Sequence, residues 1–458
     1  MTALTAEVVI CGAGIAGVAA AYELAVVHGV RDVLLVERGD PLALTSDKST
    51  EAYRNWWPDP AMVGLMSRSL DRLEAIARAT GNAILLNRRG YLYATGAEGG
   101  PVAMRASAEA ISALGAGPLR VHGPGGGAAP YAPAPAHGFE GQPDGADLIL
   151  DPALLREQFP FLGEGVVAAL HVRRAGWFGA RQLGMLMLEE ARARGVRLLR
   201  GHVAGVALAG GRVSGVRVAA PGDEIDISTR RFVSAAGPLQ GEVAGLLGLE
   251  LPLHHELHLK VSFNDHLGVV PRHAPMLIWA DPVRLPWGDD ERAELAADPE
   301  LRALLDELPP GAHIRPEGGP GATALLLLWD YHAPRVAPTF PIAADPMLAE
   351  IALRGLSAMI PGLAAYLERL PQAYVDGGYY TRTPENRPLI GPLPVAGAYI
   401  VGGLSGYGLM AACGAAELLA AHVLGAGLPA YAPDLAPARY DDPAYRARLE
   451  AWGDVGQL

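Results

Sequence analysis

Short apolar runs alternate with a helical pattern at the start of the chain. Residues 7–11 form an apolar run that leads into Gly12, and apolar positions with helical spacing then continue to His28. A second apolar run, residues 33–36, ends on Glu37. Continuous apolar runs of this length are typical of parallel strands buried on both faces. The start of the chain therefore predicts a strand–helix–strand unit.

The same reading predicts further elements along the chain. The period of the apolar positions and the turn residues between them place helices over 59–79 and 182–194, hairpins over 84–93 and 203–218, and a strand over 230–237. A strand-rich block occupies residues 249–340, with strands over 254–263 and 324–331, and a long helix begins at about Leu409. This alternation predicts a mixed α/β fold.

One segment has the composition of a loop. Residues 122–146 are rich in Gly, Pro and Ala and cannot form a regular element. They predict a long surface insertion or lid that is disordered or loosely packed.

Size and charge narrow the classes of protein. A chain of 458 residues that is 50% hydrophobic can bury a large core divided into two or three domains. A formal net charge of −12 argues against nucleic acid and anionic membranes as partners. The apolar stretches 8–27 and 399–428 are interrupted by glycines, so we expect neither a signal peptide nor a membrane span. A soluble cytoplasmic protein is the default.

Metal binding and disulfides are not expected. The two cysteines, Cys11 and Cys413, lie in the first strand and in a C-terminal helix, where small core residues are more frequent than a disulfide. No His, Cys or Asp cluster has the spacing of metal ligands.

The glycines after the first strand predict a dinucleotide site. Gly12 permits a tight turn, Gly14 leaves room for a pyrophosphate, and Gly17 lets the helix lie close to the strand. The helix N-terminus offers N–H groups and a positive dipole to phosphates. Glu37 follows Gly17 by 20 residues (37 − 17), where a carboxylate can accept hydrogen bonds from ribose hydroxyls. FAD or NAD is favoured over NADP, although Arg38 could in principle meet a 2′-phosphate.

Four motifs in a fixed order indicate a family. The N-terminal glycine motif is followed by AAGP at 235–238, YTRTPENRPLIG at 380–391 and GGLSGYGLMAACG at 402–414. This order resembles the FAD-dependent D-amino-acid oxidase superfamily, in particular its branch of sarcosine oxidase, glycine oxidase and dimethylglycine dehydrogenase. The likeness spans nearly the whole chain apart from residues 122–146.

The resemblance implies a fold and a chemistry. It implies an α/β fold, with a Rossmann-like FAD-binding domain of the glutathione-reductase type and a substrate domain built on a mostly antiparallel sheet. The FAD-binding domain would comprise residues 1–80, 150–248 and 372–458, and the substrate domain residues 81–149 and 249–371. Members of this branch oxidise a C–N bond of a small amine or amino acid by hydride transfer to flavin N5, and the imine then hydrolyses. The partners would be that substrate and O₂ or another electron acceptor.

The resemblance also implies which residues contact FAD. They lie in the glycine turn, at and after the end of the second strand, in the middle of the chain and in the C-terminal glycine motif. These residues are Gly12, Gly14, Ile15, Ala16, Gly17, Glu37, Arg38, Ser49, Thr50, Val203, Ala236, Gly237, Gly403, Gly406, Tyr407, Gly408, Leu409 and Met410. Sarcosine oxidases tether the flavin to a cysteine that corresponds to Gly378. Other relatives use a histidine just after the second strand, and residues 38–57 contain none. FAD should therefore be held non-covalently.

The expected substrate site departs from the family pattern. Arg54 matches the arginine that binds the substrate carboxylate in sarcosine oxidases, but Met410 stands at the position of their second, lysine contact. A bidentate Arg–carboxylate pair could suffice alone, or the substrate could lack a carboxylate. Tyr380 and His332 match positions that line the pocket, and either could take a proton from the amine.

The electron acceptor is left open by two further positions. Leu328 replaces the lysine that activates O₂ in the relatives, and this loss of a cation favours a dehydrogenase over an oxidase. Lys260 is, with Lys48, one of the two lysines in the chain, and it could supply a cation from another strand or could lie on a solvent face.

Two alternatives remain at this stage. A 2-hydroxy-acid dehydrogenase could use the same fold, with a C–O bond oxidised in place of C–N. A flavin subunit without catalysis is the second alternative.

Overall fold

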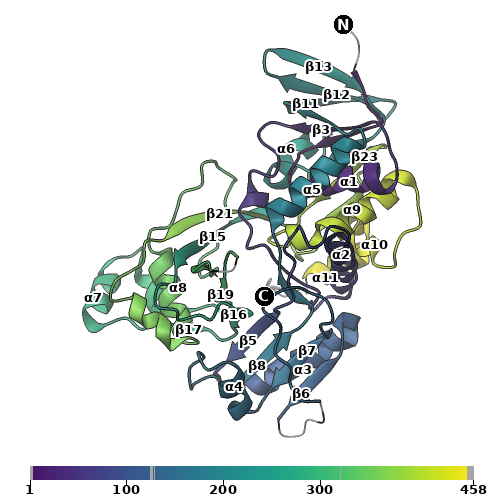
Figure 1. Ribbon diagram of the computed structural model, residues 1–458. Helices are drawn as coiled ribbons and strands as arrows, with labels where there is room; N and C mark the ends of the chain where they lie inside the picture. The colour runs from purple at the N-terminus through teal and green to yellow at the C-terminus, as the bar shows by residue number, and fades with distance from the viewer. Residues whose placement is uncertain (1–3, 124–126, 128, 320, 451–458) are drawn as a thin grey trace.

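Two large sheets organise the protein. The computed structural model describes residues 4–123, 127, 129–319 and 321–450 (Figure 1). The first sheet has six strands, all parallel except the last, in the order β10 (Arg197–Arg200), β3 (Val33–Glu37), β2 (Val8–Cys11), β14 (Phe232–Ser234), β23 (Ala398–Gly402) and β22 (Leu389–Pro392).

Both faces of the six-stranded sheet are buried, which explains its uninterrupted apolar runs. In β2, Val8 and Ile10 pack into a core shared with the helices, whereas Val9 and Cys11 pack into a second core on the opposite face. A four-stranded sheet covers that opposite face, in the order β1 (Leu4–Thr5), β13 (Asp223–Ser228), β12 (Arg212–Ala220) and β11 (His202–Ala209).

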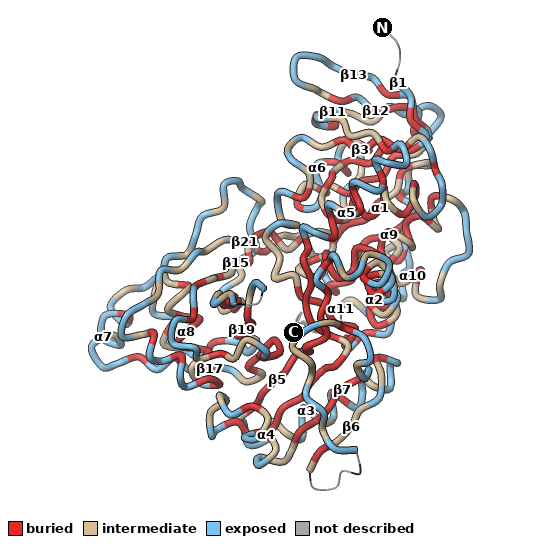
Figure 2. The backbone as a smooth tube through the Cα atoms, viewed as in Figure 1, coloured by how far each residue is buried: buried red, intermediate tan, exposed pale blue. Residues whose placement is uncertain are grey.

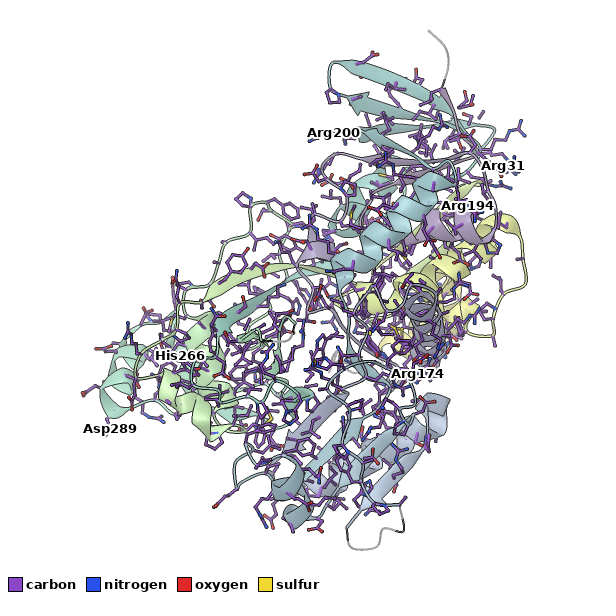
Figure 3. All side chains as sticks on the ribbon, viewed as in Figure 1. Arg31, Arg174, Arg194, Arg200, His266 and Asp289 are labelled. Carbon is purple, nitrogen blue, oxygen red and sulfur yellow. The ribbon has the colours of Figure 1, made fainter. Side chains whose placement is uncertain are left out.

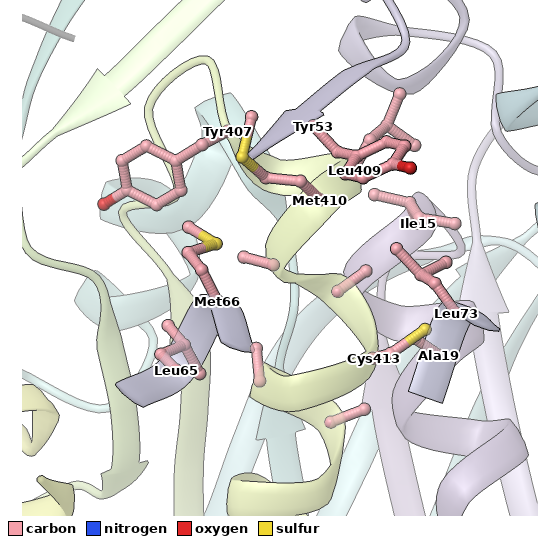
Figure 4. Close-up of a cluster of buried hydrophobic side chains, with 14 of the residues drawn as sticks. Ile15, Ala19, Tyr53, Leu65, Met66, Leu73, Tyr407, Leu409, Met410 and Cys413 are labelled. Carbon is pink, nitrogen blue, oxygen red and sulfur yellow. The ribbon is translucent and has the colours of Figure 1, made fainter. Parts of the chain in front are cut away.

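Helices cover the other face. They are α1 (Ile15–Tyr22), α2 (Pro60–Ala79), α5 (Ala180–Ala193) and α9 (Gly408–Leu424). Helix α9 packs against both α1 and α2 (Figure 4), and a Cβ on Gly414 would lie only 2.8 Å from the Leu65 carbonyl oxygen. The side chain of Asp59 caps α2 by accepting a hydrogen bond from the Met62 N–H at 2.9 Å.

The second sheet has nine strands and a core of its own. Its order is β21 (Tyr374–Arg382), β15 (His254–Asn264), β20 (Ala324–Leu328), β19 (His313–Pro316), β16 (Met276–Trp279), β5 (Tyr91–Thr95), β8 (Ala168–Val172), β7 (Ala146–Ile149) and β6 (Leu119–His122). Most of its neighbouring strands are antiparallel. Helix α8 (Leu348–Leu356) buries its apolar face in this core. Figure 2 shows the buried chain concentrated in the sheets and in the helices that cover them.

Smaller elements lie around the two sheets. The remaining strands form the pairs β4 (Ala52–Arg54) with β9 (Ala175–Trp177) and β17 (Val283–Arg284) with β18 (Glu307–Leu308). The remaining α-helices are α3 (Gly100–Ile111), α4 (Pro152–Gln158), α6 (Gln240–Gly245), α7 (Asp289–Ala297), α10 (Ala432–Leu435) and α11 (Pro443–Glu450). The labelled side chains of Arg194, Arg200 and Asp289 lie on the periphery, where they are exposed (Figure 3). None of the described helices combines the length and apolarity that crossing a membrane requires.

Most elements expected from the sequence are confirmed, together with the α/β fold class. The strand–helix–strand unit, the helix over 59–79, the hairpin over 203–218 and the long C-terminal helix are all present. The two-domain division stays a prediction. Strands β7 and β8, which straddle its boundary at residue 150, both belong to the nine-stranded sheet.

The predicted hairpin over 84–93 is wrong. Residues 84–90 form no strand, and Leu85 is exposed with a positive φ of 56°. The Asn82 side chain bonds both backbone groups of Leu86, which favours a turn. Strand β5 pairs instead with β8 and β16, which lie far along the chain.

The described part of the insertion over 122–146 has no strand or helix between β6 and β7, as expected, but this part is not loosely packed. Arg173, Arg89 and Arg88 donate hydrogen bonds to the carbonyl oxygens of residues 132, 136 and 143, at 2.7–2.9 Å. Phe139 is buried in the helical core. Residues 124–126 and 128 lie outside the described residues.

Candidate functional site

A cavity of about 360 Å³ lies at the carboxyl ends of the parallel strands. Residues at the ends of β2, β3, β14 and β23 line one side, and residues of β15, β20 and β21 line the other. Ligands of open α/β sheets bind at this edge, because the strand ends leave a crevice there. The cavity therefore coincides with the place where the sequence predicts a dinucleotide.

The glycine turn after β2 is fixed by close backbone contacts. Gly12 has a φ of +103°, and a Cβ there would lie 2.5 Å from the Ala235 carbonyl oxygen. A Cβ on Gly17 would lie 1.9 Å from the Gly12 carbonyl oxygen. Gly14 lines the cavity at the N-terminus of α1. The turn thus aims the N-terminus of the helix at the cavity.

Glu37 is fixed at the end of β3. Its carboxylate accepts hydrogen bonds from the N–H of Ala13 at 2.8 Å and of Gly39 at 2.9 Å. Both Glu37 and the adjacent Arg38 line the cavity. A half-buried carboxylate at this point can accept hydrogen bonds from ribose hydroxyls.

The loop over residues 42–51 closes one side of the cavity, and three elements fix it. From β19, Arg315 donates to the Thr50 carbonyl oxygen through Nη2 at 2.7 Å and Nε at 3.1 Å. From β15, Lys260 Nζ donates to the Ser49 carbonyl oxygen at 3.1 Å. At the start of α5, the Glu51 carboxylate accepts from the Ala180 N–H at 2.9 Å. Residues of the nine-stranded sheet and of helix α5 therefore determine where this loop lies.

Polar side chains of β15 share the face toward the cavity. His254, Glu256, His258 and Lys260 occupy alternate positions, whereas Val261 and Phe263 face the opposite core. Of these four polar residues, His258 and Lys260 line the cavity, as do Leu328 of β20 and Tyr380 of β21.

His258 is the most constrained of these groups. Its ring stacks on Tyr380, with 3.6 Å between centroids and 15° between planes. Its Nδ1 lies 2.6 Å from Asp330 Oδ1, and its Nε2 lies 3.3 Å from Glu256 Oε2. Burial lowers the pKa of His258, but the two carboxylates outweigh burial and raise its pKa above the ordinary value.

Lys260 forms an ion pair at the cavity wall. Its ammonium lies 3.4 Å from Asp376 Oδ1, and the other oxygen of Asp376 lies 3.4 Å from Lys48 Nζ. The two lysines of the chain therefore meet at one carboxylate, beside the loop over 42–51.

Most of the residues expected to contact FAD line the cavity. They are Gly12, Gly14, Ile15, Ala16, Glu37, Arg38, Ser49, Thr50, Val203, Ala236, Gly237, Gly403, Gly406, Gly408 and Leu409. Gly17, Tyr407 and Met410 lie behind this lining. Gly17 packs on Gly12, and the Tyr407 hydroxyl donates to the Asn386 carbonyl oxygen at 2.8 Å. Met410 is buried in the helical core.

Two of the four expected catalytic residues, Tyr380 and Lys260, lie at the cavity wall, and the other two do not. Arg54 is buried, donates from Nε to the Trp56 carbonyl oxygen at 3.1 Å, and places its Cζ 4.4 Å from the Trp57 ring centroid. His332 is exposed, because β20 ends at Leu328 and the chain leaves the sheet before it reaches this position.

Four residues at or beside the cavity were not expected from the sequence: His258, Asp330, Arg315 and Asp376. For His258 a signal exists in the sequence: residues 254–263 place polar side chains at every second position of a strand whose other positions are mostly apolar. The other three contacts join segments far apart in the chain, and no local pattern reports them.

The residues that line the cavity fit FAD. Gly12, Gly14 and Gly403 leave room for the cofactor because they have no side chains, and the Glu37 carboxylate lies where it can contact a ribose. The N-termini of α1 and α9 both reach the cavity through Gly14 and Gly408, so that helix dipoles can favour negative charge at two points.

Comparison with solved structures shows the same fold. L-proline dehydrogenase from P. horikoshii aligns with a TM-score of 0.71 at 19% identity, covering 96% of this chain and 98% of that one. Iminodiacetate oxidase from Chelativorans sp. BNC1 aligns with a TM-score of 0.67 at 19% identity, covering 94% and 98%. Glycine oxidase from Geobacillus kaustophilus aligns with a TM-score of 0.67 at 16% identity, covering 93% and 96%.

Comparison of sequences identifies the family. No curated protein sequence matches the chain. The family model described as FAD dependent oxidoreductase matches residues 7–422, nearly the whole chain, and confirms the family resemblance of the four motifs. The chain therefore belongs to the FAD-dependent oxidoreductase family.

Proposed function

We propose that this protein oxidises the C–N bond of a small amine or amino acid. The observation that carries the proposal is the cavity itself, which joins the glycine turn and Glu37 at one end to Tyr380 and His258 at the other. Three structural neighbours share the fold, and their names give L-proline, glycine and iminodiacetate, all of them amines, as their substrates. Bound FAD would supply the two-electron acceptor that takes hydride from the carbon beside nitrogen.

The chain's own residues would bind and orient the substrate. Tyr380 and His258 form a stacked wall, and an aromatic face attracts an ammonium group. Arg54 is buried outside the cavity lining, with its Cζ 5.8 Å from the centroid of the Tyr91 ring. The Arg54 Nε donates to the Trp56 carbonyl oxygen and the guanidinium lies over the Trp57 ring, which supports a structural role beside any contact with a substrate carboxylate.

FAD would be held without a covalent bond. Gly378 offers no thiol, and a Cβ at this position would lie 3.1 Å from Thr45 Cγ2. Cys11 and Cys413 are both buried and free, and burial raises the pKa of each thiol to about 12, which makes both poor nucleophiles. Non-covalent contacts, including those of Glu37 and the glycine turn, would therefore hold the whole cofactor.

An anaerobic substrate screen tests the proposed function. The FAD-loaded protein is mixed with glycine, sarcosine, L-proline, D-proline, iminodiacetate and a set of 2-hydroxy acids, and the flavin absorbance is followed. We expect at least one amine to bleach the flavin and the hydroxy acids to leave it oxidised. Bleaching by a 2-hydroxy acid and by no amine would replace the proposal with C–O oxidation. A flavin that no compound reduces, in a protein that retains FAD, would favour a non-catalytic role.

A dehydrogenase is favoured over an oxidase. Leu328 puts an apolar side chain at the cavity wall, and the Lys260 ammonium is offset by Asp376. We therefore expect O₂ to reoxidise the reduced enzyme slowly, because little net positive charge stabilises superoxide. Lys260→Met should change this rate by less than about threefold, measured by stopped-flow mixing with air-saturated buffer. A fast native rate that Lys260→Met abolishes would identify an oxidase and make Lys260 its oxygen site.

A further inference from the structure

The imidazole of His258 is held in one orientation and one tautomer. Asp330 Oδ1 is 2.6 Å from Nδ1, and a carboxylate can only accept, so Nδ1 carries the proton. Tyr380 covers one face of the ring. Nε2 is therefore the ring nitrogen that can gain or lose a proton while the Nδ1–Asp330 contact is kept.

A second carboxylate is placed to stabilise the protonated ring. Glu256 Oε2 lies 3.3 Å from Nε2, where it accepts a hydrogen bond only when Nε2 holds a proton. Arg382 Nη1 donates to the same oxygen at 2.7 Å. Burial raises the pKa of Glu256, but the hydrogen bonds from His258 and Arg382 outweigh burial and lower its pKa to about 2. Glu256 thus stays ionised when His258 changes its protonation state.

Asp330 connects this histidine to solvent. The side chain of His258 is 5% exposed, whereas that of Asp330 is 34% exposed. A proton that reaches Nε2 can leave through the Nδ1–Asp330 contact, because the ring can release its other proton there. The cluster of Glu256, His258 and Asp330 therefore has an entrance at the cavity and an exit at the surface.

We infer that His258 accepts the proton that an ammonium substrate must lose before its C–N bond can be oxidised, an inference that rests on the proposed function. One N–H bond of the substrate breaks, the proton passes to Nε2, and the bonding pair stays on nitrogen. That pair would then be available to form the C=N bond, with bound FAD as the two-electron acceptor. Asp330 is a positioning residue that fixes the tautomer.

The groups around His258 determine the direction of its pH dependence. Glu256 and Lys260 lie on its own strand, Asp330 just after β20, and Tyr380 and Arg382 on β21. The two carboxylates raise the pKa of His258, and only the neutral ring can accept a proton. Flavin reduction should therefore be slow at low pH and should rise as pH passes the raised pKa of His258.

Anaerobic flavin reduction across pH tests the inference, with the amine that bleaches the native flavin in the screen above. His258→Asn should slow reduction by roughly 100-fold or more, and the remaining rate should rise with pH only as the substrate ammonium itself loses its proton. Asp330→Asn should move that limb to lower pH, because it removes a charge that favours the imidazolium. Titration of ¹³Cε1-labelled histidine by NMR, in the FAD-loaded protein without substrate, should show the same downward shift of the His258 pKa in Asp330→Asn.

His254→Asn is the matched control. His254 lies on the same face of β15 and also contacts Glu256, at 3.3 Å, but it is not among the described residues that line the cavity. It should keep the native rate and pH profile. A native profile in His258→Asn, in protein that retains FAD and its melting temperature, would overturn the inference while amine oxidation stands. If no amine reduces the native flavin, the proposed function fails first and this inference falls with it.

Discussion

Replacing Gly17 with alanine is expected to abolish stable FAD binding. The new Cβ would lie 1.9 Å from the Gly12 carbonyl oxygen, a backbone atom that cannot turn away as a side chain can. Either α1 moves away from β2 or the turn at Gly12 deforms, and both displace the N-terminus of α1 from the cavity. Overpacking of this kind costs about 3 kcal/mol. If this strain is relieved by distorting the FAD site, the dissociation constant of FAD rises by roughly 100-fold, since each tenfold increase in this constant corresponds to about 1.4 kcal/mol.

Two measurements check this prediction. Gel filtration of the purified variant should yield protein without yellow colour, and titration with FAD should give the weakened dissociation constant. In the native protein, acid precipitation should release all of the flavin into the supernatant, because non-covalent contacts alone are proposed to hold it.

Gly241→Ala is the control. Gly241 is also in a helix, α6, but it is exposed, and a Cβ there has no atom within 4 Å. This substitution should leave FAD retention unchanged and stabilise the fold slightly. Full FAD retention by Gly17→Ala would show that α1 does not need its close approach to β2 in order to bind the cofactor.

The dinucleotide end of the site was predictable because a single local unit builds it. Strand β2, the glycine turn, α1 and β3 are consecutive in the chain. The number of residues between two positions therefore determines where each of them lies in this unit. Gly12, Gly14 and Glu37 therefore lie where the sequence predicts them, at the carboxyl ends of β2 and β3.

The substrate end was less predictable, because register and tertiary contacts decide it. His332 was expected in the cavity because it matches a pocket-lining position of the relatives, but β20 stops at Leu328 and the chain leaves the sheet before it reaches His332. Arg54 was expected to reach the cavity, yet its guanidinium lies over the Trp57 ring. His258 belongs to a strand that does continue, so its alternate position brings it to the cavity wall.

The stretch at 380–391 joins function and stability in a way the sequence did not reveal. Tyr380 faces the cavity, but the charged residues that follow hold the C-terminal part of the chain. Arg387 pairs with Asp59, the cap of α2, at 2.6 Å and with Asp434 at 2.9 Å. The family motif thus fixes the position of Tyr380 by anchoring the strand end to two helices.

Glu385 is buried deepest among these charged residues. Its side chain is 0% exposed and that of its partner Arg439 is 2% exposed, with 2.8 Å between them. The hydroxyls of Tyr440 and Tyr445 also donate to the Glu385 carboxylate, at 2.9 Å and 3.0 Å. One carboxylate therefore accepts from all three of these donors, and removing it leaves the Arg439 guanidinium buried without its counter-charge.

Glu385→Ala should destabilise the protein by about 3–5 kcal/mol, the usual cost of removing one partner of a buried ion pair. The loss should appear first as faster hydrogen exchange in α10 and α11, and then as a lower melting temperature. Glu7→Ala is the control, because its pair with Arg231 is as short, at 2.7 Å, but exposed (47% and 35%), and should contribute less than about 1 kcal/mol. The double variant Glu385→Leu with Arg439→Leu should recover part of the loss, since neither charge is then left alone. Equal effects of Glu385→Ala and Glu7→Ala would mean that the buried pair does not hold the C-terminal helices against the strand end that carries Tyr380.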